Sequence, residues 1–279
     1  MSDRHDNRTS PAGPRFHFLS VVSLGMLALL VGLIVALFAS SLSYESLSLR
    51  HVVYLAGSPE ILAAMQLSLT SSLLTLAAVM IFAVPAGYAL ARYRFPGRAL
   101  ADAIVDMPLV VPPVIIGLSL VMFLSTGTGQ TIESGLKAGG WSLQSTFGIV
   151  LCQFFLCVPY AVRSAKTAFL EVDRSLEQTA LTLGCTRWQA FRKVTLPLAR
   201  NGLVAGGVVA WARALGVFGP MLVLLASAQV KVETMSTHIY LELSSGNLEF
   251  AIAATAIMMV LAGAALLAVH ALAPGRKWS

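Results

Sequence analysis

Residues 177–197 read EQTALTLGCTRWQAFRKVTLP and form a polar stretch between two long apolar segments. Ser175-Leu-Glu-Gln178, which overlaps the start of this stretch, fits a capping box at a helix N-terminus. Gly184 fits the left-handed residue that commonly ends a helix. Thr186-Arg-Trp-Gln189 repeats the capping-box pattern, and Pro197 marks the approach to the next apolar segment. The stretch therefore predicts two short helices joined by a glycine turn.

Each predicted helix carries an apolar face at helical spacing. The residues that share these faces are Leu176, Ala180 and Leu183 in the first helix, and Trp188, Phe191 and Val194 or Thr195 in the second. Helices of about two turns are marginal on their own, so other parts of this chain or another protein must hold them. The alternative is an interfacial loop whose amphipathic helices lie on lipid.

The composition of the whole chain points to a membrane protein. Of the 279 residues, 57% are hydrophobic and 11% are charged, and the mean hydropathy is +0.78. Because lipid offers no hydrogen-bond partner to open backbone groups, membrane-crossing segments of this kind are helices. We therefore predict an all-α membrane protein with six transmembrane helices. Their ranges are 18–42, 64–91, 107–125, 146–166, 202–226 and 250–272.

Lysine and arginine predict the orientation of these spans. With both termini inside the cell, the outer segments hold only Arg50, Lys137 and Lys231, and Arg213 lies within the fifth span. All other basic residues then lie inside, as the positive-inside rule requires. This rule explains the net charge of +6 better than a nucleic-acid partner does. The expected cytoplasmic parts are a disordered N-terminus at 1–17, a loop at 167–201 and a tail at 273–279.

Several kinds of chemistry have no signature in the sequence. No GxxxxGKS or GxxxxGKT phosphate loop occurs, and the LSSGN run at 243–247 has no nucleotide-binding context. No HExxH motif, disulfide framework or metal-ligand spacing is present, so we expect no enzyme activity, no cofactor and no metal site. The energy for transport must come from another chain or from an ion gradient. Ion-coupled transporters usually keep acidic or basic residues within their spans to carry protons or ions. Here the spans contain few: Asp106 lies at the start of the third span and Arg213 within the fifth, and there is no acidic relay.

The polar stretch resembles the cytoplasmic EAA loop of ABC importer permeases, which reads E-A-A, three residues, G, nine residues, I-x-L-P. This chain matches the spacing throughout, with Gln178, Thr179 and Val194 in place of Glu, Ala and Ile. Glu177 stands one residue early and is able to supply the missing charge. If the family's carboxylate contacts the ATPase, these departures weaken that contact. The resemblance implies that the ATPase-coupling residues are Glu177, Gln178, Thr179, Ala180, Gly184, Val194, Leu196 and Pro197.

Two runs in the spans narrow the resemblance. DMPLVVPPV at 106–114 and WARALGVFG at 211–219 resemble the DLPLVLPPVV and ARALGEFG runs of molybdate, tungstate and sulfate permeases. Polyamine, ferric-iron and thiamine permeases share much of the same architecture and remain alternatives. Val217 stands where these permeases often have Glu, and that removes a local partner for Arg213. The candidate substrate-pathway residues are Arg213, Pro112, Pro113, Phe218 and Gly219.

Arg213 lies about 11 residues into the fifth span, or about 16 Å along a helix, which is near the middle of a bilayer. A cation at that depth usually faces the bundle interior or a wet cavity. It either meets an anionic substrate or forms a structural ion pair with another span.

The family resemblance also implies an architecture and a set of partners. The fold would be that of a type I ABC importer permease, with the ABC transmembrane domain at 60–272 and coupling helices in the cytoplasmic loop. The partners would be cytoplasmic ABC ATPase subunits, an extracytoplasmic substrate-binding protein and a second permease subunit, most simply in a homodimer. The chain would be a multi-pass protein of the cell inner (plasma) membrane that carries a small oxyanion such as molybdate, tungstate or sulfate.

Overall fold

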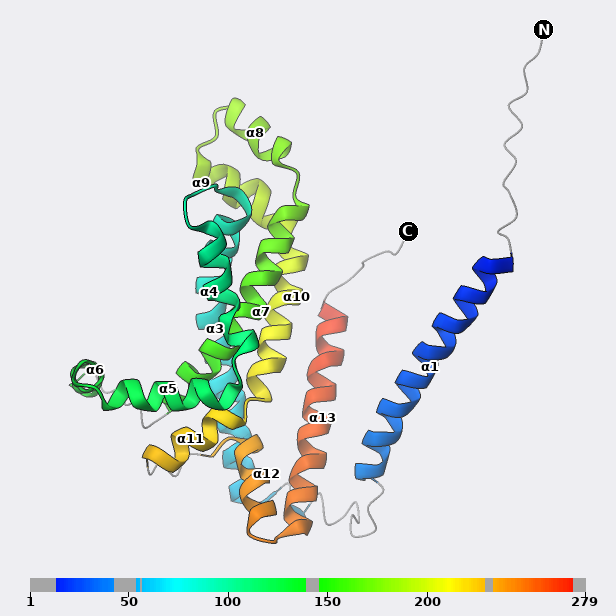
Figure 1. The fold of residues 1–279 in the computed structure, drawn as a ribbon, viewed down its shortest axis with the longest axis vertical. Helices are drawn as coiled ribbons and strands as arrows, with labels where there is room; N and C mark the ends of the chain where they lie inside the picture. The colour runs from blue at the N-terminus through cyan, green and yellow to red at the C-terminus, as the bar shows by residue number, and fades with distance from the viewer. Residues whose placement is uncertain (1–13, 43–53, 56, 139–145, 229–232, 273–279) are drawn as a thin grey trace. The chain divides into compact units, whose positions relative to one another are not determined.

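The computed structural model describes residues 14–42, 54–55, 57–138, 146–228 and 233–272, and its regular elements over these ranges are all helices (Figure 1). The chain divides into two compact units, Met1–Leu49 and Arg50–Ser279. Helix α1 (Pro14–Leu42) belongs to the first unit and covers the predicted first span. Because α1 begins at Pro14, residues 14–17 of the predicted disordered N-terminus are helical. Residues 1–13 and the predicted tail at 273–279 lie outside the described residues.

Three helices form the core of the second unit: α3 (Pro59–Arg92), α7 (Thr146–Glu171) and α10 (Leu196–Leu215), which run side by side. Small residues allow their backbones to approach closely. A Cβ on Gly87 would lie 2.6 Å from Ala165 Cβ, and one on Gly206 would lie 2.4 Å from Ser164 Cβ. Close contact of small residues is how helices associate in lipid, where no hydrophobic drive operates between them. The core therefore depends on backbone proximity as well as on large apolar side chains.

Helix α3 is longer than a bilayer requires. Its 34 residues measure about 50 Å, whereas the hydrocarbon core is about 30 Å thick. Ser58 caps its first turn by accepting a hydrogen bond from the backbone N–H of Ile61 (3.4 Å), and Pro59 occupies the first helical position. The last turns of α3 reach the polar end of the unit, where Arg92 contacts Glu177 of the polar stretch.

Two of the predicted spans are broken rather than straight. Helices α4 (Arg98–Val110) and α5 (Pro113–Ser125) meet at 108°, and the helix that ends at Leu215 meets α11 (Gly219–Ala228) at 46°. The α4–α5 break follows from chemistry, because a residue that precedes proline avoids the helical region and Val111 has ψ 130°. The predicted helices over 107–125 and 202–226 are therefore each interrupted by a bend, although each bent pair passes the criterion for a span when taken together.

Fewer than six of the described helices meet a length and composition criterion for a membrane span. By length and composition, three of the described helices are able to cross a membrane, or five if each bent pair forms one span. Helix α13 (Leu248–Leu272) covers the sixth predicted segment, but its stretch Leu248–Ala264 is too short for the same criterion. The all-helical membrane fold is confirmed, whereas the count of six is not.

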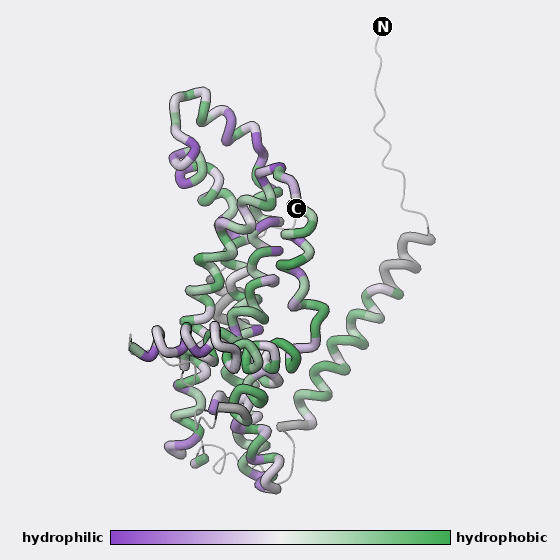
Figure 2. The backbone as a smooth tube through the Cα atoms, turned by 60° about the vertical axis from the view of Figure 1, so that its left-hand side comes forward, coloured by the Kyte–Doolittle hydropathy of each residue, from purple (hydrophilic) through white to green (hydrophobic). Residues whose placement is uncertain are grey.

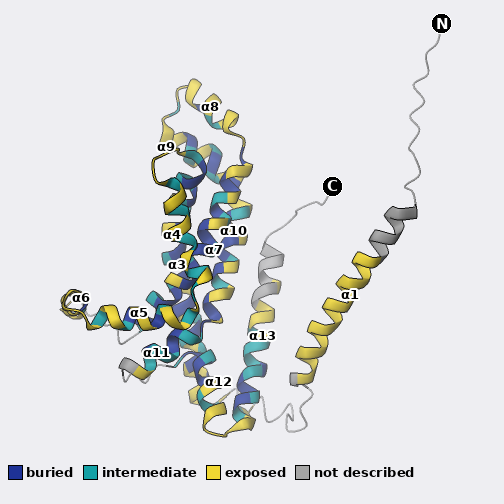
Figure 3. Ribbon diagram, in the orientation of Figure 1, coloured by how far each residue is buried: buried dark blue, intermediate teal, exposed yellow. Residues whose placement is uncertain are grey.

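The second unit has a polar end and an opposite end. At the polar end lie α8 (Arg174–Thr182), α9 (Arg187–Ala190) and the π-helical segment η1 (Phe191–Thr195). At the other end, α12 (Met235–Ser244) pairs with α13, whereas α5 and α6 (Gly127–Ala138) project to the side (Figure 1). Hydrophilic residues gather on the α8–α9 end (Figure 2). Figure 3 shows that this end is largely exposed, in contrast to the core-facing sides of α3, α7 and α10.

Candidate functional site

Helix α8 begins earlier than its sequence pattern predicts. Its N-cap is Asp173, whose Oδ1 accepts a hydrogen bond from the backbone N–H of Ser175 at 2.9 Å. The predicted cap at Ser175 is therefore wrong, because Asp173 is an equally good capping residue and Ser175 lies inside the first turn. The Ser175 hydrogen bonds hold the pKa of the exposed Asp173 carboxyl below its usual value.

The glycine turn after α8 has the predicted geometry. Gly184 has φ +88°, in the left-handed region. The N–H of Cys185 donates to the carbonyl of Ala180, and the N–H of Gly184 donates to that of Leu181, both at 3.0 Å. This pair of bonds is a Schellman motif, which satisfies carbonyls at the helix end. The prediction of a left-handed cap at Gly184 is confirmed.

The second short helix has its predicted start but continues further than expected. Thr186 and Gln189 exchange hydrogen bonds in a capping box, with Gln189 Oε1 2.9 Å from the Thr186 N–H. Beyond it, α9 passes through the π-helical residues of η1 into α10, so the helix is continuous over Arg187–Leu215. The wide turn directly precedes Pro197, which is unable to donate an α-helical backbone bond. The second helix is thus the start of the broken span rather than a separate element.

Apolar side chains stand exposed on this polar end. Leu183 is 80% exposed and Trp188 is 67% exposed, and Leu176 is also exposed, whereas Ala180 is buried. The predicted face of Leu176, Ala180 and Leu183 is therefore split between the interior and the surface. Large apolar side chains grouped on a polar surface are typical of an interaction site.

The residues of the EAA-like pattern separate into two groups. Gln178, Thr179 and Pro197 are exposed. Those that face inward wholly or in part are Glu177, Ala180, Val194 and Leu196. The Glu177 carboxylate contacts Tyr88 and Arg92 of α3 and Thr195 of η1. Sequence reasoning missed these partners because they are distant in the chain.

Arg213 lies near the end of α10, where its guanidinium stands over the ring of Tyr160, with 5.7 Å from Cζ to the ring centroid. An arginine over a phenol ring is a favourable cation–π contact. Among the described side chains, no carboxylate pairs with Arg213, and Val217, one turn further on, is buried. Within this part of the chain, Arg213 therefore keeps its charge available.

A buried amide fixes the backbone next to Arg213. Gln153 of α7 donates from Nε2 to the carbonyl of Ala214 (3.2 Å) and to Ser71 Oγ (3.3 Å), and its Oε1 accepts from Thr75 (2.7 Å). The break after α10 leaves such carbonyls without helical partners, and the amide satisfies one of them. Gln153 was not anticipated from the sequence, although an amide within the apolar run 146–166 is itself a signal.

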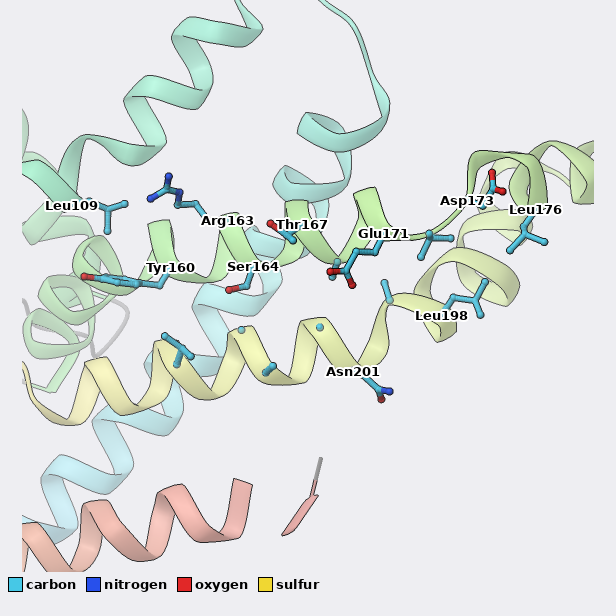
Figure 4. Close-up of a pocket in the computed structure, with 17 residues that line it drawn as sticks. Leu109, Tyr160, Arg163, Ser164, Thr167, Glu171, Asp173, Leu176, Leu198 and Asn201 are labelled. Carbon is cyan, nitrogen blue, oxygen red and sulfur yellow. The ribbon is translucent and has the colours of Figure 1, made fainter. Parts of the chain in front are cut away.

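A groove of about 1240 Å³ runs along α7 and α10 (Figure 4). On α7, Tyr160, Ser164 and Thr167 line it at helical spacing, while α10 contributes mainly small residues. Arg163 also lines the groove and pairs with Asp106 of α4 at 3.5 Å. The groove therefore offers hydroxyl donors beside a paired cation, and two carboxylates, those of Glu171 and Asp173, also line it near α8. The groove extends from Leu176 of α8, at the polar end, to Tyr160. Arg213 stands over the ring of Tyr160.

The remaining predicted pathway residues lie at the two helix breaks. Pro112 and Pro113 form the α4–α5 break, and Phe218 and Gly219 form the α10–α11 break. A Cβ on Gly219 would lie 2.9 Å from a methyl of Val114, so the structure brings the two breaks together. Neither these four residues nor Arg213 is among the described residues that line the groove.

Comparisons with known proteins agree with this architecture. A family model described as "Binding-protein-dependent transport system inner membrane component" matches residues 83–278. A probable molybdenum ABC transporter permease protein of Haloferax volcanii is 39% identical over 72% of this chain and 71% of its own length. The sulfate transport system permease protein CysT of Escherichia coli is 33% identical over 88% of both chains.

Solved structures show the same fold at lower identity. The crystal structure of a bacterial alginate ABC transporter, in complex with an alginate pentasaccharide-bound periplasmic protein, contains a chain that is 21% identical. It covers 93% of both chains with a TM-score of 0.70, which shows the fold alone. On the strength of the family match and the sulfate relative, this chain belongs to the family of inner membrane components of binding-protein-dependent transport systems.

Proposed function

We propose that this chain is the permease subunit of an ATP-driven importer of a small tetrahedral oxyanion, such as molybdate, tungstate or sulfate. The observation that supports an anionic substrate is Arg213, which has no carboxylate partner among the described side chains and stands over the ring of Tyr160. Tyr160 itself lines the groove, although Arg213 is not among the described residues that line it. Relatives named for molybdenum and for sulfate support the same substrate class. A cationic polyamine is disfavoured, because the arginine would repel it.

The proposed orientation places both termini in the cytoplasm. The α8–α10 end carries Arg174, Arg187, Arg192, Lys193 and Arg200, and this concentration of basic residues is typical of a cytoplasmic loop. The groove would then open toward the cytoplasm beside α8.

The energy would enter through the exposed surface of α8 and α9. A short helix with protruding apolar side chains such as Leu183 fits a groove on a partner protein, and Trp188 extends the same surface. The partners are two ATPase subunits, a second permease copy and a substrate-binding protein on the outer side. The alginate transporter, solved with a periplasmic protein bound, supports the last of these.

The proposed mechanism is alternating access. When ATP closes the ATPase pair, the docked helices approach one another and carry α7 and α10 with them. The outer side then opens to receive the anion, and ATP hydrolysis returns the groove to its inward-open state.

Ion-coupled transport is the alternative from another class. Two carboxylates of α4 that would be candidates for ion coupling are already paired, Asp102 with Lys166 at 2.5 Å and Asp106 with Arg163. A carboxylate in a salt bridge is a poor carrier of a transported proton or sodium ion. To bind that ion it would have to leave its lysine or arginine partner, whose charge would then be uncompensated.

Reconstitution into liposomes tests the proposal. With the cognate ATPase, ATP and the binding protein, we expect uptake of labelled molybdate, tungstate or sulfate against a gradient. With any of the three left out, uptake should fall to the background of empty liposomes. A chain that accumulates the anion from a proton or sodium gradient alone would contradict the proposal.

A further inference from the structure

The carboxylate of Glu177 is enclosed by the chain itself. Its side chain is only 16% exposed. Tyr88 Oη donates to Oε1, and Thr195 Oγ1 donates to Oε2 at 3.3 Å. Arg92 Nε lies 3.3 Å from the same Oε2 and makes no hydrogen bond of good geometry, so this contact is mainly an attraction between charges. The carboxylate thus connects α8 to the end of α3 and to η1.

Two arginines bind the backbone on either side of this contact. Arg92 is 6% exposed and donates from Nη2 to the carbonyl of Val172 at 2.9 Å. In the opposite direction, Arg174 donates from Nη2 to the carbonyl of Ala91 at 2.8 Å. A buried guanidinium needs a compensating charge, and Glu177 is its carboxylate partner among the described residues. The start of α8 is therefore attached to the last turn of α3 by three separate polar contacts.

An aromatic cluster shields the same contact from water. The ring of Tyr88 packs edge-on against Phe169 at 5.4 Å and against Phe191 at 4.7 Å, and Trp188 stacks on Phe191. These rings come from α3, α7, α9 and η1. Shielding strengthens an ionic contact, because less water screens the charges. It also orients the Tyr88 hydroxyl toward the carboxylate.

The sequence offset explains why this carboxylate faces inward. Successive residues of a helix point about 100° apart. The position that matches the family's glutamate is Gln178, which is exposed. Glu177, one residue earlier, therefore points toward α3. The neutral amide is the group offered to a partner, and the charge is kept within the chain.

We infer that Glu177 is a positioning residue that couples α8 to α3, so that a displacement of the docked helix is passed to α3 through the Glu177–Arg92–Tyr88 contact. This inference rests on the proposed function, since it assumes that an ATPase moves α8. It differs from the family expectation, in which the acidic residue of the loop serves the ATPase directly.

The test is Glu177→Gln in the reconstituted complex of permease, ATPase and binding protein. The amide keeps the shape of the side chain and removes its charge. We expect ATPase binding and the rate of ATP hydrolysis to stay within about twofold of wild type. The number of anions imported per ATP should fall by about three- to tenfold, which lies within the roughly 2- to 30-fold change that mutations along coupling networks produce.

Two further variants sharpen this result. Tyr88→Phe removes one hydrogen bond to the same carboxylate and should lower the coupling ratio less, and the double variant should be no worse than Glu177→Gln alone. Glu60→Gln makes the same chemical change at an exposed position at the other end of α3 and should leave the ratio unchanged.

The outcomes separate this inference from the proposed function. An unchanged ratio in Glu177→Gln contradicts the inference, as does weakened ATPase binding with a normal ratio in the complexes that form. If Glu177→Gln does not assemble, Tyr88→Phe decides: a lowered ratio supports the inference and an unchanged one contradicts it. A wild-type permease that binds no ATPase would instead contradict the proposed function.

Discussion

Gly184→Val should leave ATP hydrolysis running while anion uptake per ATP falls by about tenfold or more. Gly184 has φ +88°, and no atom lies within 4 Å of the position that its Cβ would take. The free-energy cost of a side chain at this position therefore comes from the backbone conformation and not from a clash with neighbouring atoms. The left-handed region costs an ordinary residue about 1–2 kcal/mol, and a β-branched side chain is worse. The strain is relieved only if the turn changes, which misdirects α9 relative to α8.

A graded series controls for this prediction. Asparagine tolerates the left-handed region better than other residues, so Gly184→Asn should retain most of the coupled transport. Gly184→Ala should fall between Asn and Val. Uptake and ATP hydrolysis are measured in the same liposomes. Equal coupling in the Asn and Val variants would show that the left-handed cap does not matter for coupling.

Arg213→Gln should reduce anion uptake by about 10- to 100-fold while the permease still assembles with its partners. A hydrogen bond to a charged group contributes about 1.5–3 kcal/mol, which corresponds to this range of rates. Arg213→Lys keeps the charge but loses the planar guanidinium that stacks on Tyr160, so its uptake should be intermediate. Initial uptake rates over a range of anion concentrations measure the effect.

Arg200→Gln is the matched control, because it removes an exposed arginine from the polar end of the same helix. Its uptake should stay close to that of wild type. If Arg213→Gln prevents subunits from assembling, Arg213 is a structural partner of another chain. Wild-type uptake in an assembled Arg213→Gln permease would remove the main support for an anion.

The glycine turn and the second cap could be predicted from the sequence because they depend on residues only a few positions apart. Gly184 and the Thr186–Gln189 pair satisfy backbone groups within their own turn. The predicted N-cap of α8, Ser175, was wrong because a second capping residue, Asp173, stands only two positions away. Asp173 and Ser175 are both good capping residues, and in the structure it is the Asp173 side chain that accepts a backbone N–H of the first turn.

Features that depend on distant partners could not be predicted. The break within 107–125 is an exception, because it follows from Pro112 and Pro113 themselves, which a hydropathy pattern does not weigh. The inward direction of Glu177 depends on Tyr88 and Arg92, which lie more than eighty residues earlier in the chain. Hydropathy and motif spacing contain no information on such pairs.

The central claim is that force from a separate ATPase enters this chain through α8 and α9. A cysteine at position 178, paired with one in the facing groove of the ATPase, tests it most directly, in a background in which Cys185 is replaced by serine. The claim predicts a disulfide that forms readily, stops ATP-driven uptake and is reversed by reduction. Failure to form it, together with a spin label at position 178 that senses lipid rather than protein, would contradict the claim and favour a loop that lies on the membrane.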